Sequence, residues 1–291
     1  MRTFNEFAVF DWSGQNVERP KGIALARCRA GKAPQLHTPV TNHWSRNDVL
    51  HWLIKAADSQ SDVLIGFDLS MGFPFNDTGA FFPGWEHTPH SAPALWQLVD
   101  KLCATDAHLA ANSFVTHPEL SRYFRHQGQL GDRYGAEKSG RLRVVEAESR
   151  SEMSVRPYSC LNLVGAAQVG KSSLTGMRLL HRLRGIIPVW PFDPMPERGP
   201  VIAEIYTSIA ASAAQLPKGR SKIRDQATLN AAFAALGTPA CATLNCYDDH
   251  STDALLTAAW LSKAAFNSQF WQPKLMTDKI AQTEGWTFGV S

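Results

Sequence analysis

Four acidic positions along this 291-residue chain have the surroundings from which a metal site can be built. Asp11 closes the apolar run FAVFD, Asp68 closes DVLIGFD, and Glu204 lies within VIAEIY. Asp253 belongs to a group of acids that opens a long apolar segment. Buried carboxylates are costly unless a partner or a metal ion neutralises them, and their oxygens suit Mg²⁺ or Mn²⁺. The candidate metal ligands are Asp11, Asp68, Asp249 and Asp253. With two ions, such a site hydrolyses phosphodiesters.

Each of these acids also has an ordinary structural explanation. Asp is common in turns at strand ends. Asp248 and Asp249 precede a helix pattern, and we expect one of them to cap that helix and complement its dipole. Glu204 fits the alternation of a solvent-facing strand residue equally well. Asp253 is harder to explain in this way, because it lies three residues after His250 on the same side of the helix. We therefore take His250 as an auxiliary ligand or proton shuttle.

The elements that must position these acids follow a β-β-β-α-β order over the first seventy residues. Strand patterns occupy 7–11, 21–30 and 35–40, and an amphipathic helix capped by Ser45 occupies 45–60. The continuous apolar run at 62–68 is typical of a buried, parallel strand. Three consecutive strands favour an antiparallel meander, whose sheet the fourth strand then joins.

The rest of the chain continues the α/β pattern around one weak stretch. Residues 72–158 are interrupted by prolines, so we expect them to form a loop and helix insertion after the fourth strand. Helices are expected at 93–109, 172–185 and 247–266, and 218–237 is expected to hold a basic lead-in and then a helix that Gly237 stops. Strands are expected at 186–192 and 200–207, and a short strand or docked loop at 284–290. The prediction is one domain over 1–291, with a mixed sheet flanked by helices.

Six short motifs carry a resemblance to a known family. FDWSG, GFDLSMGFP, VGKSSLTGMRLLHRLR, AEIYTS, STDALLTAAWL and EGW occur in this order. Together they resemble the DUF429 family, whose members are described as predicted nucleases of ribonuclease H-like fold. HSTDA, from His250, also resembles the HxxDA that opens the last helix in some Holliday-junction resolvases.

The resemblance implies a role for each matching residue. Asp11 matches the metal ligand of the first strand, and Asp68 matches the carboxylate that closes the fourth strand, where resolvases often carry Glu. Asp253 matches the ligand of the last helix, with His250 beside it. Glu204 has no counterpart in the resolvases and is left as a catalytic-site or substrate-side group. The implied activity is a metal-dependent nuclease, a hydrolase that uses Mg²⁺ or Mn²⁺.

A second motif indicates a different function. GAAQVGKS, from Gly165 to Ser172, fits the phosphate-loop pattern of nucleotide-binding proteins. A working loop follows a core strand, for which CLNLV is the candidate, and opens a helix. However, about 160 residues precede it, and no later strand ends in an Asp that could hold magnesium. The alternatives are a kinase or NTPase, a plain glycine turn, or a helix start whose Lys171 and Ser172 contact nucleic-acid phosphate.

DWSG also resembles the first phosphate loop of sugar kinases and actin-like ATPases, which share the ribonuclease H-like core. Those proteins carry two such domains, which need a longer chain than this one. A second glycine-rich phosphate loop is not evident in the sequence. We therefore rank this interpretation below the nuclease.

Basic residues provide candidate contacts to a nucleic-acid backbone. The runs KGRSKIR (218–224) and KSSLTGMRLLHRLR (171–184) contain no acid, and Arg178 and Arg182 lie four residues apart in the second. We take Arg178 and Arg182, with Lys171 and Ser172, as candidate phosphate-binding residues. An ordinary solvated helix face explains either run alone. The net charge of +3 neither demands nor excludes a polyanionic partner, and a non-catalytic nucleic-acid-binding module remains an alternative.

Composition also bears on the compartment. No apolar run reaches the roughly 18 residues of a membrane span, and the N-terminal pattern is a strand and not a signal peptide. Five cysteines at dispersed positions indicate reduced thiols. We expect a cytoplasmic protein without a membrane partner.

Overall fold

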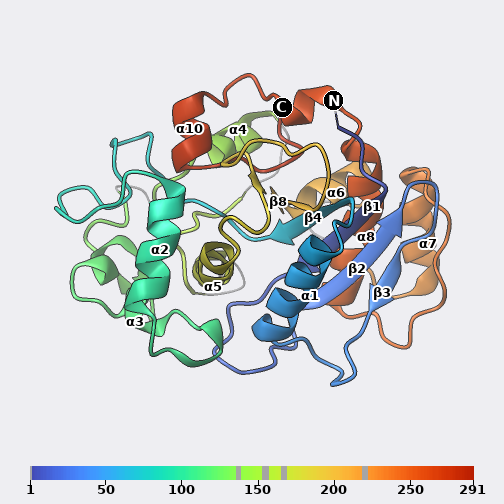
Figure 1. Ribbon diagram of the computed structural model, residues 1–291, viewed down its shortest axis with the longest axis horizontal. Coiled ribbons are helices and arrows are strands. Elements are labelled where there is room, and N and C mark those ends of the chain that lie inside the picture. Colours follow the sequence, from blue (N-terminus) through green and yellow to red (C-terminus); the bar gives the residue numbers. More distant parts are fainter. Residues whose placement is uncertain (1, 136–138, 153–156, 165–168, 218–221) are drawn as a thin grey trace.

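A mixed six-stranded sheet forms the centre of the part of the chain that the computed structural model describes, which is residues 2–135, 139–152, 157–164, 169–217 and 222–291. The strand order is β3-β2-β1-β4-β8-β7 (Figure 1). The strands are β1 (Glu6–Asp11), β2 (Ala24–Arg29), β3 (Gln35–His37), β4 (Val63–Asp68), β7 (Val189–Trp190) and β8 (Val201–Ile205). β1, β2 and β3 form the predicted antiparallel meander, and β4, β8 and β7 continue the sheet in parallel with β1.

Local sequence signals explain where the main helices begin and end. Ser45 caps α1 (Arg46–Asp58) in a reciprocal capping box with Asp48, as the sequence predicts. Asp248 caps α8 (Asp249–Ala264) by accepting from the Ser251 amide, so one of the two adjacent acids does have a capping role. Gly237, with a φ of +62°, follows the end of α7 (Gln226–Ala235). The other helices are α2 (Ala92–Leu102), α3 (Asn112–Val115), α4 (Val144–Glu152), α5 (Val169–Arg182), α6 (Thr207–Ala213), α9 (Ser268–Trp271) and α10 (Asp278–Thr283).

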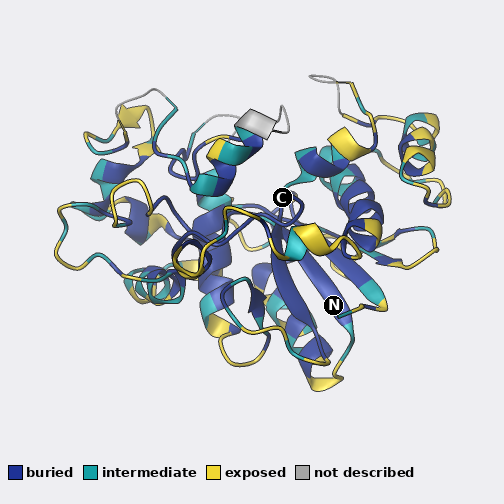
Figure 2. Ribbon diagram, turned by 90° about the horizontal axis from the view of Figure 1, so that it is seen from above, coloured by how far each residue is buried: buried dark blue, intermediate teal, exposed yellow. Residues whose placement is uncertain are grey.

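Helices cover both faces of the sheet, and the strands alternate their side chains between two cores. Ala8 and Phe10 of β1 pack with α1, α2 and α5, whereas Phe7 and Val9 pack with α6, α7 and α8. The central strands are therefore buried on both sides (Figure 2). This is why β1, β4 and β8 are nearly continuous apolar runs, and why an acid at the end of such a run stands out.

The segment predicted as an insertion packs directly on the first of these cores. It contains α2, α3 and the small hairpin of β5 (Arg125–His126) and β6 (Gln129–Leu130). Phe73, Phe82 and Phe124 join the core that contains α1 and α5. The buried Arg141 donates hydrogen bonds to the Asp77 carboxylate and to the carbonyls of Pro74, Ala80 and Phe81. One guanidinium therefore serves several hydrogen-bond acceptors of this loop.

Three further expectations concern the cysteines, a membrane span and the C-terminal tail. All five cysteines are free, and three of them are buried. In the described part of the chain, each helix is either too short or too polar to cross a bilayer. The tail at 284–290 is a docked loop, in which Phe288 N donates to the carbonyl of Glu204.

Candidate functional site

Asp11 and Asp68 lie side by side at the carboxyl ends of two parallel strands. β1 and β4 pair in parallel with Asp11 opposite Asp68 in the register. Asp253 approaches from α8, which packs against β1 and β2. Burial, the charge of Asp11 and then the charge of Asp253 raise the pKa of Asp68 to about 7, so all three carboxylates share one electrostatic environment.

Each of the three carboxylates also has one neighbouring partner. Asp11 Oδ2 lies 2.7 Å from His250 Nδ1, and this hydrogen bond is the main reason that the pKa of His250 is raised. Thr207 Oγ1 donates to Asp68 Oδ2. Lys222 Nζ lies 3.2 Å from Asp253 Oδ2, and burial raises the pKa of Asp253 to about 6 despite this cation. The partner of Asp11 is a titratable imidazole and the partner of Asp68 is a neutral hydroxyl, so Lys222 is the one permanently charged partner of the three. These partners carry less positive charge than three ionised carboxylates carry negative charge.

The donor set suits a hard divalent cation, although the side chains are not arranged around one. Three carboxylates from β1, β4 and α8 supply only oxygen ligands, which is the preference of Mg²⁺ and Mn²⁺. In the described ranges, no group of three or more His, Cys, Asp or Glu side chains has the spacing of a formed metal site. The residues fit the ion in chemistry and in uncompensated charge, and binding requires Asp253 to leave Lys222.

A cavity of about 300 Å³ lies beside these carboxylates. Its wall includes Asp68, His250, Lys171 and Ser172, together with Tyr158 and Tyr206. The first turn of α5 reaches this cavity because it packs closely on the loop after β1. A Cβ on Gly14 would lie 2.4 Å from the backbone carbon of Lys171, so this approach requires glycine.

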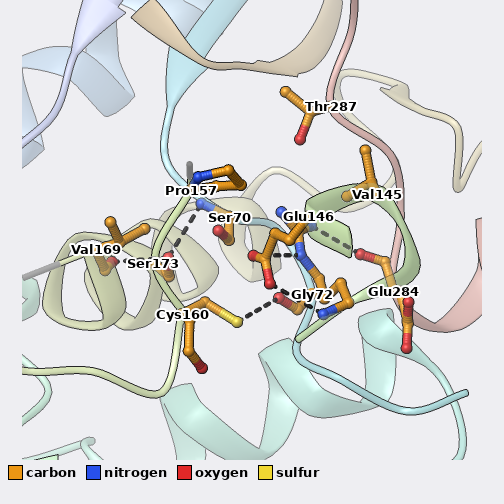
Figure 3. Close-up of polar contacts among 12 residues, drawn as sticks. Ser70, Gly72, Val145, Glu146, Pro157, Cys160, Val169, Ser173, Glu284 and Thr287 are labelled. Atoms are coloured by element: carbon orange, nitrogen blue, oxygen red, sulfur yellow. Dashed lines mark hydrogen bonds and ion pairs between the residues drawn. The ribbon is translucent and has the colours of Figure 1, made fainter. Parts of the chain in front are cut away.

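Ser173 fixes the same turn of α5 against the end of β4. Its Oγ accepts from Ser70 N at 3.0 Å and donates to Val169 O at 2.8 Å (Figure 3). No carboxylate of the described residues lies within ion-pair distance of Lys171, whose side chain is half-buried. Lys171 and Asp68 therefore line one cavity, and Asp11 lies beside Asp68 in the strand register.

Glu204 belongs to a buried ion-pair network and does not fit the catalytic role expected for it. Arg143 NH1 and NH2 bind its two oxygens at 2.8 and 2.6 Å, and Met71 N donates to Oε2 at 2.7 Å. Arg143 also binds Glu146 Oε1 at 3.1 Å and the Glu284 carbonyl at 3.0 Å. Glu204 lies in the cavity wall, and both of its carboxylate oxygens accept hydrogen bonds from Arg143 or Met71. We therefore assign Glu204 a structural role in that wall.

Two of the four residues expected to bind phosphate lie elsewhere. Arg178 is buried, and it binds Asp100 Oδ1 at 2.8 Å and the carbonyls of Asp106 and Ala110. Arg182 lies in the last turn of α5, 3.6 Å from the same Asp100 oxygen. The prediction of a phosphate contact from Arg178 was wrong, because this side chain packs against the 92–110 segment and not against solvent. Arg182 is exposed but does not line the cavity, and it pairs with Asp100 instead. Lys171 and Ser172 do line the cavity.

Asp249 is tied to two cations at the start of α8. Arg224 binds its Oδ1, and Lys222 Nζ lies 3.3 Å from its Oδ2. The hydrogen bond from Arg224 lowers the pKa of Asp249, which sets it apart from Asp68 and Asp253. Of the four residues expected to bind the metal, Asp249 is therefore the one that the structure supports least.

The described part of the phosphate-loop motif lacks the context that such a loop needs. Gly165–Gln168 lie outside the described residues, as do 218–221 of the basic run KGRSKIR. CLNLV forms no strand, since Asn162 makes only an isolated bridge with Arg125. A Cβ on Gly170 would lie 2.4 Å from the carbonyl oxygen of Cys160, so packing already explains this glycine.

Sequence reasoning missed several residues of this site. Lys222 was noted only as part of a basic run, and its pairing with Asp253 depends on two segments far apart in the chain. Arg143 gave no signal, and Thr207 was noted only as part of the AEIYTS motif, because their partners lie 61 and 139 positions away. Comparisons with family models, with curated proteins and with solved structures find no match for this chain. The resemblance to the DUF429 family therefore stays a prediction.

Proposed function

We propose that this chain is a metal-dependent phosphodiesterase that acts on nucleic acid. The observation that supports it is the approach of Asp11, Asp68 and Asp253 to one another beside a cavity that also receives Lys171. Carboxylates without enough positive charge suit a divalent cation. Lys171, which pairs with no carboxylate among the described residues, suits the phosphate that the cation would face. A meander followed by parallel strands, with an Asp ending the first strand, is the arrangement expected of a ribonuclease H-like fold, and it agrees with this proposal.

Each residue of the site has a separate role in this proposal. Asp11, Asp68 and Asp253 hold Mg²⁺ or Mn²⁺. A divalent ion in such a site lowers the pKa of water and stabilises charge on the leaving oxygen. Asp11 fixes His250 through Nδ1, so Nε2 is the atom that exchanges a proton. Lys171 and Ser172 contact the phosphate from the first turn of α5.

The direct test is isothermal titration with Mn²⁺ on wild type and on Asp11→Asn. We expect wild type to bind Mn²⁺ and Asp11→Asn to bind it at least tenfold more weakly, because the isosteric amide removes the charge at the centre of the cluster. Asp58→Asn, at the exposed end of α1, is the matched control and should bind as wild type does.

Hydrolysis of single-stranded and duplex DNA and RNA is then measured with the same proteins. Metal binding without hydrolysis of any of these would indicate a non-catalytic module. ATP is titrated in parallel. Binding of ATP that is lost in Lys171→Ala, with no binding of Mn²⁺ alone, would replace the proposal by a kinase or NTPase.

Lys222 gives a second prediction about the metal. Its ammonium group competes with a cation for Asp253, so Lys222→Ala is expected to bind Mn²⁺ about threefold more tightly, as removal of a half-exposed ion pair allows. The measurement is the same titration, with the exposed Lys55→Ala as control. Weaker binding by Lys222→Ala would mean that Lys222 supports the site instead of competing with the ion.

A further inference from the structure

The cavity beside the carboxylates has an aromatic side that phosphodiester chemistry alone does not require. Tyr158 and Tyr206 line it, with Leu69 and Ile205 nearby in the same wall. Cavities of about 300 Å³ are at the lower end of the range for small organic ligands, whereas a phosphate group fills far less. A planar, partly apolar molecule would fill this space better than a phosphate group alone.

Tyr158 is an exposed ring with no partner in the described part of the chain. It is 58% exposed, and within that part neither a hydrogen bond to its hydroxyl nor an aromatic neighbour holds the side chain. Large aromatic rings at a cavity rim provide stacking surfaces for nucleobases, because every base has a π face.

The backbone around Tyr158 is held in place on both sides. Arg150 donates to the carbonyl of Pro157 at 3.1 and 2.6 Å, and the buried Ser159 donates to the carbonyl of Arg141 at 2.5 Å. Pro157 lines the same cavity as Ser70, next to the end of β4 (Figure 3). The backbone of Tyr158 therefore needs little ordering when a ligand stacks on the ring, and the entropy cost is confined to the side-chain torsions.

We propose that this cavity is a nucleoside subsite in which an unpaired base stacks on Tyr158 while its phosphate lies toward Lys171 and Asp68. The inference rests on the proposed phosphodiesterase function and names its substrate class. A base that is paired inside a duplex cannot enter a cavity of this kind, whereas a base in a single strand can. The substrate is therefore a phosphodiester next to an unpaired nucleotide.

The test compares AMP with ribose 5-phosphate, which has the same phosphate and sugar but no base. Both are titrated calorimetrically into wild type, Tyr158→Ala and Tyr158→Phe in the presence of Mg²⁺. Wild type is expected to bind AMP about tenfold more tightly than ribose 5-phosphate, and Tyr158→Ala is expected to lose that difference. Tyr158→Phe keeps the ring and should retain the wild-type affinity for AMP.

A second arm tests the preference for unpaired bases. A single-stranded oligonucleotide should displace fluorescent AMP at least tenfold more effectively than the same sequence as a duplex, with Ca²⁺ in place of Mg²⁺ to occupy the site while slowing cleavage. The inference is overturned if wild type binds AMP and ribose 5-phosphate equally well, or binds neither. It is also overturned if Tyr158→Ala binds AMP as tightly as wild type does.

The outcome is separable from that of the proposed function. If Mn²⁺ binds at the aspartates but AMP gains nothing from its base, the subsite fails and the metal site stands. If Mn²⁺ does not bind, the phosphodiesterase fails, and the difference between AMP and ribose 5-phosphate still decides whether Tyr158 holds a base.

Discussion

Asp68→Asn is expected to lower phosphodiester hydrolysis at least a hundredfold and, without metal, to make the folded protein more stable. Hydrolysis falls because one of the three carboxylates that we propose as ligands of the ion is lost, and loss of weaker outer contacts already costs 10- to 100-fold in metal sites. Stability rises by about 1–2 kcal/mol, because Asn keeps the hydrogen bond from Thr207 and removes a charge that repels Asp11 and Asp253.

The pH dependence of unfolding gives the sign of this effect. The pKa of Asp68 is about 7 in the folded protein and near the ordinary 3.8 after unfolding. Between these values the folded state binds the extra proton, so the stability of metal-free wild type falls as the pH rises through this window. The free energy of unfolding is measured with urea at about pH 5 and about pH 8. The amount by which Asp68→Asn exceeds wild type should be larger at the higher pH.

A matched control separates this effect from a general loss of negative charge. Asp58→Asn removes an exposed carboxylate and should leave the difference between the two pH values unchanged. If wild type is as stable as Asp68→Asn at the higher pH, the three carboxylates do not repel one another in the folded protein. The main argument for a cation between them is then lost.

The elements of the fold could be predicted because their signals are local. The meander of β1, β2 and β3, the capped helix α1 and the buried strand β4 all follow from periodicity and turn residues within a few positions. The convergence of Asp11 with Asp68 needs only one more step, since parallel strands of equal length bring their carboxyl ends to the same edge.

The side-chain environment could not be predicted from the same signals. Arg178 belongs to a basic amphipathic pattern that is typical of a solvated face, yet Asp100 and two carbonyls bury it. Periodicity records which side of a helix is polar, but not whether another segment will cover that side with its own polar groups. Glu204 fitted both a solvent-facing and a catalytic interpretation, and only Arg143, 61 positions away, excludes both.

Arg143→Met is expected to lower the free energy of unfolding by about 3–5 kcal/mol. Arg143 is fully buried and is shared by Glu204 and Glu146, so its loss leaves two buried carboxylates without their cation. Urea unfolding monitored by circular dichroism measures the change. Arg143→Lys keeps the charge but not the two-pronged contact with Glu204, and should lie between Arg143→Met and wild type.

Arg122→Met is the control for this network, since Arg122 also binds two carboxylates but does so in solvent. It should leave the unfolding midpoint nearly unchanged, because exposed ion pairs contribute little. Adding Glu204→Gln to Arg143→Met should restore part of the lost stability by removing one unpaired charge. Equal effects of Arg122→Met and Arg143→Met would show that burial does not strengthen the network.

The network also connects stability to the candidate site. Glu204 accepts from the amide of Met71, three residues after Asp68, and Glu284 accepts from the amides of Phe75 and Asn76 in the same segment. Arg143 binds the Glu204 carboxylate and the backbone carbonyl of Glu284, so it holds the chain that leaves β4 against β8 and against the C-terminal loop. Its loss should therefore weaken Mn²⁺ binding even though Arg143 contacts none of the three aspartates, because it releases the backbone that positions Asp68.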